Sequence, residues 1–111
     1  AYFSSTGPTL YDGRIKPDIL APGVNITAAS HYGSGYVSMS GTSMATPFAA
    51  GVMALAAQAK PGINPNELKD AAKGTAVPLP QQNITQNQQG KGVIDPITLI
   101  HNIAPEINIE A

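Results

Sequence analysis

The feature that most constrains this chain is a long stretch without formal charge. From Ile19 to Ala59 the sequence contains no Asp, Glu, Lys or Arg. The surface of a globular protein normally carries charged side chains, so a segment of this length is not expected to form a surface of its own. We therefore expect this segment to lie inside a body larger than the 111 residues of the chain.

The composition is that of a globular protein. Hydrophobic residues make up 42% of the chain and charged residues 12%, which is enough apolar material for a core. Six basic and seven acidic residues leave a net charge of −1, with no run of either sign, so neither nucleic acid nor a membrane is expected as a partner. The absence of cysteine excludes disulfides, thiol catalysis and Cys-ligated zinc.

Turn residues divide the first part of the chain into short extended segments. Asp12-Gly13 and Pro22-Gly23 are typical of turns, and a glycine-rich stretch from His31 to Gly35 suits a hairpin connection. The expected extended segments are Ile15 to Ala21, Val24 to Ala29, and Tyr36 to Ser40. A further short one is expected from Gly92 to Ile94, after a polar loop from Pro78 to Gly90.

A long helix is predicted to follow these segments. It should begin at Ser43 or Met44, capped by Thr42 or Ser43, and end near Ala59 before Pro61-Gly62. Small or apolar residues occupy every side of this helix, so we expect it to be buried on every side.

Two more helices are indicated by their caps. In NPNELKDAAKG, Asn64 is the expected cap, Pro65 the first helical residue and Gly74 the end. Asp95-Pro96 should open a brief helix that reaches about Asn102. The tail from residue 103 to 111 alternates weakly and is expected to be an edge strand or disordered.

The residues around Ser43 fit a nucleophile as well as a helix cap. A serine hydroxyl needs a base and oxyanion donors, and the start of a helix offers unpaired N–H groups and a positive dipole end. Gly41 leaves room for a substrate carbonyl, and Thr42 adds a hydroxyl. Pro47 has no N–H for the carbonyl of Ser43, so it is expected to loosen the first turn at the serine. Because Ser and Thr are common caps, the spacing alone does not decide between these two roles.

The stretch GTSMATPFAAG closely resembles the nucleophile motif of the subtilisin-like serine proteases, the subtilases of peptidase family S8. That motif has Gly-Thr-Ser-Met-Ala followed by Ser or Thr, Pro, His, Val, Ala and Gly. Gly41 to Pro47 and Ala50-Gly51 match it, whereas Phe48-Ala49 stand where the family usually has His-Val. Loss of that His changes the packing behind the nucleophile but does not remove the catalytic base.

The resemblance extends over nearly the whole chain. Three further segments of this chain are similar to segments of the family. They are KPDILAPG (Lys16 to Gly23), FSSTGP (Phe3 to Pro8) and GKGVID (Gly90 to Asp95). It implies an α/β fold with three layers, α/β/α, and a mostly parallel sheet, of which this chain is the C-terminal portion. Residues 1–103 would belong to the catalytic domain, and residues 104–111 to a tail or a following segment.

The resemblance also implies roles for individual residues. Ser43 would attack a peptide carbonyl to form an acyl-enzyme, with its own backbone N–H at the oxyanion. Thr42 and Gly41 would line the oxyanion pocket, and Ser40 would lie along the substrate cleft.

The other members of the family's triad precede the serine by more residues than this chain provides. The Asp, the His and the oxyanion-hole Asn are therefore expected from an N-terminal part of the same domain. His31 and His101 are the only imidazoles, and neither is favoured as the base. Asp18 occupies a position that helps to hold a weak cation in some relatives, but Lys16 nearby supplies a positive charge instead. We expect no metal and no cofactor in this segment, although calcium elsewhere in a longer protein is compatible with the family.

The leading hypothesis is thus the serine-bearing part of an endopeptidase, inactive by itself, that acts on peptides or proteins and is secreted or at the cell surface. A pseudoprotease or regulatory binding domain that keeps the fold and the serine is the alternative. A third hypothesis, a self-standing α/β domain in which Ser43 is a mere cap, predicts cooperative unfolding of the isolated chain.

Overall fold

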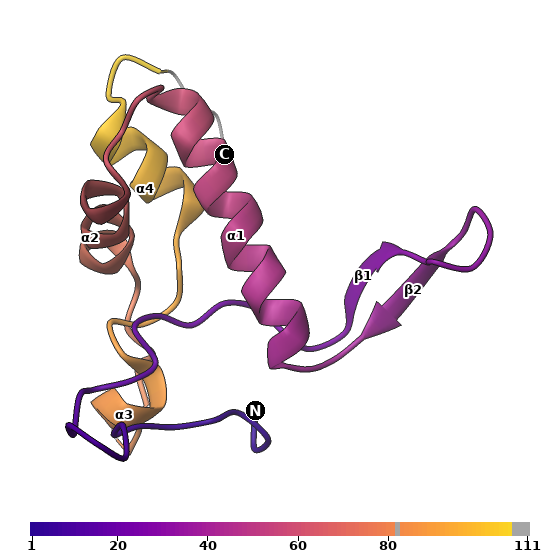
Figure 1. Cartoon of the computed structure of the whole chain (residues 1–111), viewed down its shortest axis with the longest axis horizontal. Coiled ribbons are helices and arrows are strands. Elements are labelled where there is room, and N and C mark those ends of the chain that lie inside the picture. The colour runs from indigo at the N-terminus through magenta and orange to yellow at the C-terminus, as the bar shows by residue number, and fades with distance from the viewer. Residues whose placement is uncertain (82, 108–111) are drawn as a thin grey trace.

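The computed structural model describes residues 1–81 and 83–107, and Figure 1 shows its arrangement. A two-stranded hairpin is followed by helices packed against one another. The elements in chain order are β1 (Ile26–Ala29), β2 (Tyr36–Met39), α1 (Thr42–Ala59), α2 (Pro65–Thr75), α3 (Gln86–Gln89) and α4 (Pro96–Ile103). Among the described helices, none combines the length and hydropathy that crossing a bilayer requires.

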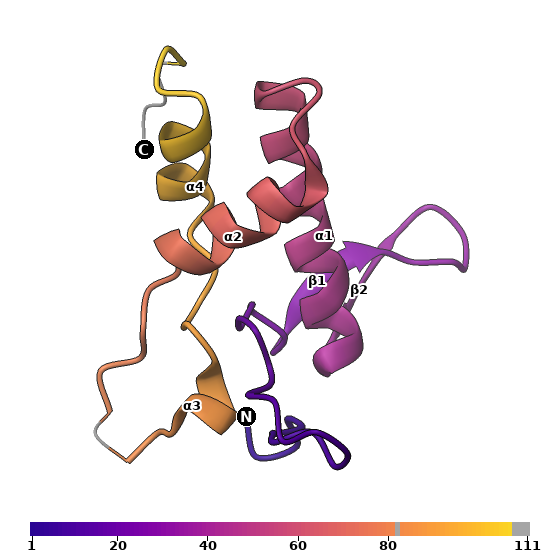
Figure 2. The ribbon, with the colours of Figure 1, turned by 60° about the vertical axis from the view of Figure 1, so that its left-hand side comes forward.

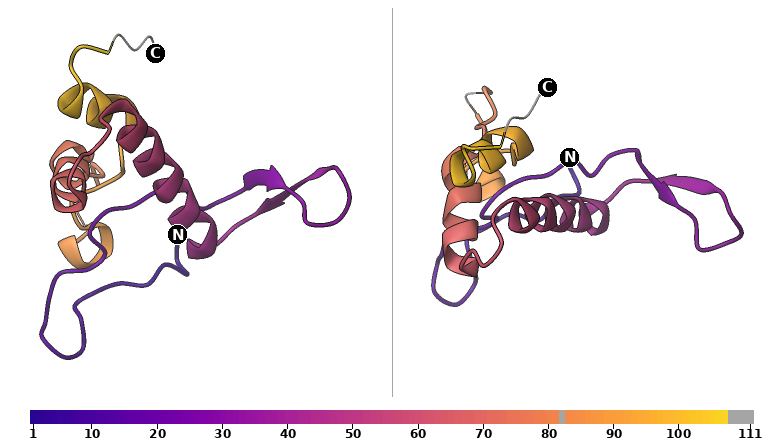
Figure 3. Two further views of the ribbon diagram at one scale, coloured as in Figure 1. Left: turned by 45° about the horizontal axis from the view of Figure 1, so that its top comes forward. Right: turned by 90° about the horizontal axis from the view of Figure 1, so that it is seen from above.

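The hairpin projects away from the helices. Its strands are antiparallel, with Ile26 opposite Met39 and Ala29 opposite Tyr36. The views in Figure 3 agree that it extends from the start of α1, on the side opposite α2 and α4. All four residues of β2 are exposed. The predicted hairpin is confirmed, but β1 begins at Ile26 and not at Val24.

The core lies where α1, α2 and α4 meet. Figure 2 shows α4 and α2 beside the later part of α1. One apolar cluster holds them together, formed by Val52, Ala56, Ala72, Ile94, Leu99, Ile103 and Ala104. Among the described residues, Leu99 has the largest side chain that is completely buried. Burial of such aliphatic groups is the main stabilising contribution in a small core.

The prediction that α1 is buried on every side is wrong for this chain. Val52 and Ala56 are its buried residues, whereas Phe48 is 38% and Leu55 55% exposed. The other helices cover one side of the later turns, and the segment around Gly23 approaches the first turns at Ala45, but neither covers the exposed residues. An apolar helix requires burial but does not itself supply the partner that provides it.

The predicted caps of α2 and α4 are confirmed. The side chain of Asn64 accepts a hydrogen bond from the Asn66 N–H at 2.8 Å, and Asp95 accepts one from the Thr98 N–H at 3.1 Å. Proline occupies the first turn of both helices. The expected end of α2 at Gly74 is wrong by one residue, because the helix continues to Thr75.

The predicted strand from Ile15 to Ala21 is wrong. Within this segment Leu20 alone takes part in a bridge, which is parallel and joins it to Val93. Pro17 lacks the N–H that a ladder needs. Val93 also pairs with Val77. The extended piece expected from Gly92 to Ile94 is likewise no strand, and it is reduced to the two isolated bridges of Val93.

The polar stretch from Pro78 to Gly90 is not entirely a loop, because α3 lies within it. The Gln88 side chain accepts a hydrogen bond from the Thr85 N–H at 2.8 Å, which stabilises the start of this short helix. In the tail, Ala104 is fully buried. The predicted edge strand is wrong for residues 103–107, because Ile103 ends α4 and no strand follows it up to residue 107. Residues 108–111, to which the prediction also applies, lie outside the described residues, and the boundary between residues 103 and 104 remains a prediction.

Candidate active site

The start of α1 differs from the predicted cap. Gly41 is the N-cap residue, with φ 155° and ψ 164°, and no side chain caps this end. Its carbonyl accepts hydrogen bonds from the N–H groups of Met44 at 3.0 Å and Ala45 at 3.3 Å. The prediction that Thr42 or Ser43 caps the helix is therefore wrong. Both residues are already helical, and Ser43 is the second residue of α1.

Ser43 and Thr42 are exposed at this end of the helix. Within residues 1–81 and 83–107, their backbone N–H groups donate to no acceptor. Unpaired N–H groups at a helix start, together with the positive end of the helix dipole, stabilise negative charge placed beside them. The first turn of α1 is therefore suited to hold an anionic oxygen next to the Ser43 hydroxyl.

The first turn also has altered hydrogen bonding on its carbonyl side. Pro47 lies within α1 and has no N–H to donate to the carbonyl of Ser43. One residue earlier, the Thr46 hydroxyl donates to the carbonyl of Thr42 at 3.0 Å. The helix nevertheless continues through Pro47 to Ala59 without interruption. The loosening is thus limited to one backbone bond at Ser43.

Two hydrogen bonds tie the residues before α1 to the other side of the hairpin base. The Gly41 N–H donates to the carbonyl of Gly23 at 2.7 Å. The Asn25 N–H donates to the hydroxyl of Ser40 at 2.8 Å. The sequence indicates Gly23 as a turn residue at the end of a family-like segment and gives Asn25 no place in the site, because no local pattern reveals either contact.

A pocket of about 650 Å³ lies beside the start of α1. Gly41, Thr42 and Thr46 contribute to one wall. The facing walls come from the chain's first residues and from the segment around Leu20; they include Phe3, Ser4, Ile19, Leu20, Ala21 and Val24. The structure thus places two of the predicted site residues, Gly41 and Thr42, on the wall of a mostly apolar hollow.

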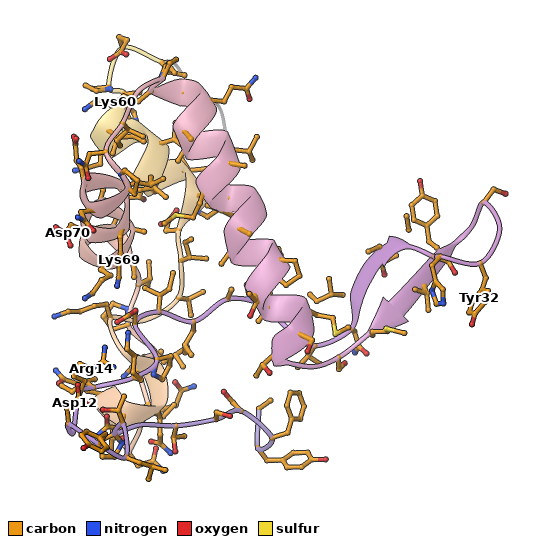
Figure 4. All side chains as sticks on the ribbon, in the orientation of Figure 1. Asp12, Arg14, Tyr32, Lys60, Lys69 and Asp70 are labelled. Atoms are coloured by element: carbon orange, nitrogen blue, oxygen red, sulfur yellow. The ribbon has the colours of Figure 1, made fainter. Side chains whose placement is uncertain are left out.

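Neither histidine lies at the start of α1. The ring of His31 lies against that of Tyr32, with centroids 3.8 Å apart and planes inclined at 43°, in the loop at the far end of the hairpin. Figure 4 labels Tyr32 at this tip. His101 is exposed in the last turn of α4, which packs against the later part of α1. The described residues therefore offer no imidazole to Ser43.

Lysines from two parts of the chain surround Asp18. The ammonium groups of Lys16, Lys69 and Lys73 lie 2.8, 3.6 and 3.9 Å from its carboxylate. The hydrogen bond from Lys16 is the main cause that lowers the pKa of Asp18; burial opposes it, and the charges of all three lysines assist it. Lys69, labelled on α2 in Figure 4, reaches back to this carboxylate.

These ammonium groups supply the positive charge that Asp18 needs, as the sequence predicted for Lys16. In the part of the chain that the structure describes, no three His, Cys, Asp or Glu side chains gather as metal ligands. The absence of a metal and of a cofactor remains a prediction.

Comparison with known proteins identifies relatives among proteases. The model of the subtilase family matches residues 1–92. Over 86 residues the chain is 50% identical to the serine protease AprX of Bacillus subtilis strain 168, covering 66% of this chain and 19% of AprX. Over 100 residues it is 45% identical to the minor extracellular protease Vpr of the same strain, covering 83% of this chain and 12% of Vpr.

Solved structures give the same result. The CspB protease of Clostridium perfringens superposes with a TM-score of 0.78 at 25% identity, over 93% of this chain and 24% of that one. The chain thus spans less than a fifth of AprX and about a quarter of the CspB structure. Its helices and short sheet form part of the α/β subtilisin fold. From the family match and these likenesses together, the chain belongs to the subtilase family of serine proteases.

Proposed function

We propose that this chain carries the nucleophile, Ser43, of a serine endopeptidase. The observation that carries the proposal is the position of Ser43. It is exposed as the second residue of α1, beside two N–H groups with no acceptor among the described residues, within the stretch that matches the family. An activated serine requires oxyanion donors of this kind and an open approach.

The reaction would proceed through an acyl-enzyme. The Ser43 Oγ attacks the carbonyl carbon of the scissile peptide while a base accepts its proton, and the resulting oxyanion accepts a hydrogen bond from the Ser43 N–H. The C–N bond then breaks, and the leaving amine takes the proton from the base. Water attacks the acyl-enzyme by the same steps and frees the carboxylic acid and the Ser43 hydroxyl.

The base must come from outside this chain. His31 is at the tip of the hairpin and His101 is on α4, so neither can receive the Ser43 proton in this arrangement. We propose that an N-terminal part of the same domain supplies the Asp, the His and an oxyanion-hole Asn. The apolar pocket at the start of α1 and the uncovered sides of that helix are surfaces against which such a part can pack.

The substrates would be peptides or proteins, as expected for the family. Secretion or a place at the cell surface is proposed by analogy with relatives such as Vpr, which is named an extracellular protease. In this setting Gly41 and Thr42 border the oxyanion, and Ser40 lies next to them in the chain.

A fluorophosphonate probe, which phosphonylates an activated serine with loss of fluoride, tests the proposal. In the full protein that carries this chain, we expect labelling at Ser43, its loss in Ser43→Ala, and normal labelling in Ser38→Ala, an exposed serine on β2. The 111-residue chain alone should label slowly, because removal of triad members leaves only residual catalysis. A full protein that folds but does not label would instead support a pseudoprotease. Rapid labelling of the isolated chain would contradict the need for an N-terminal part.

A further inference from the structure

We propose that Ser40 is a positioning residue for Ser43, acting through the hydrogen bond that its hydroxyl accepts from the Asn25 N–H. The inference rests on the proposed function of Ser43. In this proposal Ser40 does not serve mainly to line the substrate cleft. Its hydroxyl closes the base of the hairpin and thereby fixes the turn in which Ser43 lies.

The two residues that precede α1 are held by the same opposing segment. Ser40 accepts from Asn25 at 2.8 Å, and Gly41 donates to Gly23 at 2.7 Å. The bond at Gly41 joins backbone to backbone and needs no particular side chain. The bond at Ser40 needs a hydroxyl at that position. We call these two hydrogen bonds together the clamp. The bond to the Ser40 hydroxyl is the part of the clamp that a side-chain substitution can remove.

The conformation of Asn25 explains why a side chain takes this place. The ladder of the hairpin ends at the pair Ile26 and Met39, so Asn25 and Ser40 would form the next rung. Asn25 has φ 54°, the left-handed conformation, and is the one residue other than glycine with positive φ among those described. The left-handed conformation turns the chain at Asn25 out of the ladder. The Asn25 N–H therefore donates to the Ser40 hydroxyl and not to a backbone carbonyl.

The clamp connects directly to the nucleophile. Besides donating to Gly23, Gly41 accepts from the N–H groups of Met44 and Ala45 through its carbonyl. Ser43 lies inside this turn. The hairpin has few other supports, since every residue of β2 is exposed. A shift of the hairpin base is therefore transmitted to the first turn of α1, and small errors in placing a nucleophile slow catalysis strongly.

The test compares Ser40→Ala and Ser40→Thr in the full protein that carries this chain, with a peptide substrate. We expect Ser40→Ala to lower kcat roughly 10-fold with KM changed less than about 2-fold, because nucleophile placement and not ground-state binding is lost. Ser40→Thr keeps a hydroxyl and should restore kcat to within about 3-fold of the original protein. Ser38→Ala, the same chemical change on β2, should leave both constants unchanged, since no described residue bonds to its hydroxyl.

Hydrogen exchange at the Gly41 amide supplies a readout that does not depend on activity. Loss of the clamp should accelerate this exchange in Ser40→Ala but not in Ser38→Ala. Unchanged exchange, an unchanged kcat, or equal effects of Ser40→Ala and Ser40→Thr would each overturn the proposal, and a rise in KM alone would place Ser40 in the cleft. Absent labelling of Ser43 in the original protein would instead contradict the proposed function, which separates the two failures.

Discussion

The backbones of Gly23 and Gly41 touch where the hairpin meets α1. The N–H of Gly41 donates to the carbonyl of Gly23 at 2.7 Å, and a Cβ added to Gly23 would lie 2.8 Å from the carbonyl oxygen of Gly41. The start of the helix that carries Ser43 is therefore set by a close approach of two segments that are far apart in the sequence.

Gly23→Ala should destabilise the protein. The new methyl group would lie 2.8 Å from the Gly41 oxygen and 3.1 Å from the Ala45 Cβ, and backbone cannot easily move away. We expect a loss of about 1–3 kcal/mol in the free energy of unfolding, as is usual for an overpacked site. Thermal or urea denaturation measures this loss. Gly35→Ala, in the hairpin loop with nothing within 4 Å, is the matched control and should change stability little.

Asp18 should make stability depend on acidic pH. Its pKa is lowered from 3.8 in the folded protein, chiefly by the hydrogen bond from Lys16, so the ionised carboxylate stabilises the fold. This stabilisation is complete above the unfolded-state pKa and is lost as the pH falls through the lower, folded-state pKa. The difference in melting temperature between the original protein and Asp18→Asn should therefore be constant above about pH 5 and shrink below about pH 4.

A matched control separates this effect from general acid denaturation. Asp70→Asn changes an exposed carboxylate on α2 that forms no ion pair among the described residues, and Figure 4 labels it beside Lys69. It should show no comparable pH-dependent difference. High salt should also weaken the Asp18 effect, because the lysine side chains are partly exposed and screening reduces their attraction. A difference that persists unchanged at low pH would contradict a role for the ionised carboxylate.

Leu99→Ala should be among the more damaging changes in the helical core. Leu99 is 0% exposed and belongs to the apolar cluster that joins its own helix, α4, to α1 and α2. Removing its side chain leaves a cavity, for which the expected loss is about 2–5 kcal/mol of unfolding free energy. Ile97→Ala, on the same helix but 41% exposed, should have a smaller effect. Equal losses from the two variants in a denaturation experiment would show that the core is not centred on Leu99.

Pro47→Ala should stabilise α1 and slow acylation. Alanine restores the N–H that can bond to the carbonyl of Ser43, which regularises the first turn and raises helix stability. If the loosened turn helps to hold the nucleophile, the rate of fluorophosphonate labelling should fall. Pro65→Ala removes a proline at the start of α2, where no N–H is needed, and should leave labelling unchanged. Acylation at the original rate in Pro47→Ala would refute this role of the proline.

Much of the fold could be predicted because its determinants are local. The bond from the Asn66 N–H to Asn64, the proline that follows the cap, and the Asp95 cap of α4 each involve residues within three positions of one another. The long apolar helix and the glycine-rich hairpin were also read correctly. The proposal that Ser43 is the nucleophile rests on the resemblance of residues 41–51 to a family, since a serine before a helix does not by itself distinguish a nucleophile from a cap.

The wrong predictions share a cause that is not local: they depend on contacts between distant segments. The sequence predicts a hydroxyl as the cap of α1, yet Gly41 takes that position, and its N–H is bonded to the distant Gly23. The strand expected before Pro22 reduces to one bridge at Leu20 because its partners in this chain are few. Propensity describes what a segment can adopt, and pairing between distant segments decides what it does adopt.

The sequence by itself determined the three longer helices (α1, α2 and α4), the hairpin and the family, because capping, periodicity and an eleven-residue motif are all contained within short segments. Only the tertiary structure decided how Ser43 is held. The contacts from Gly23 to Gly41, from Asn25 to Ser40, and from Lys69 and Lys73 to Asp18 join residues whose separation in the chain gives no pattern to detect. Hydrogen bonds and charges act over a few ångströms in space, and the distance along the chain does not reveal which groups come that close.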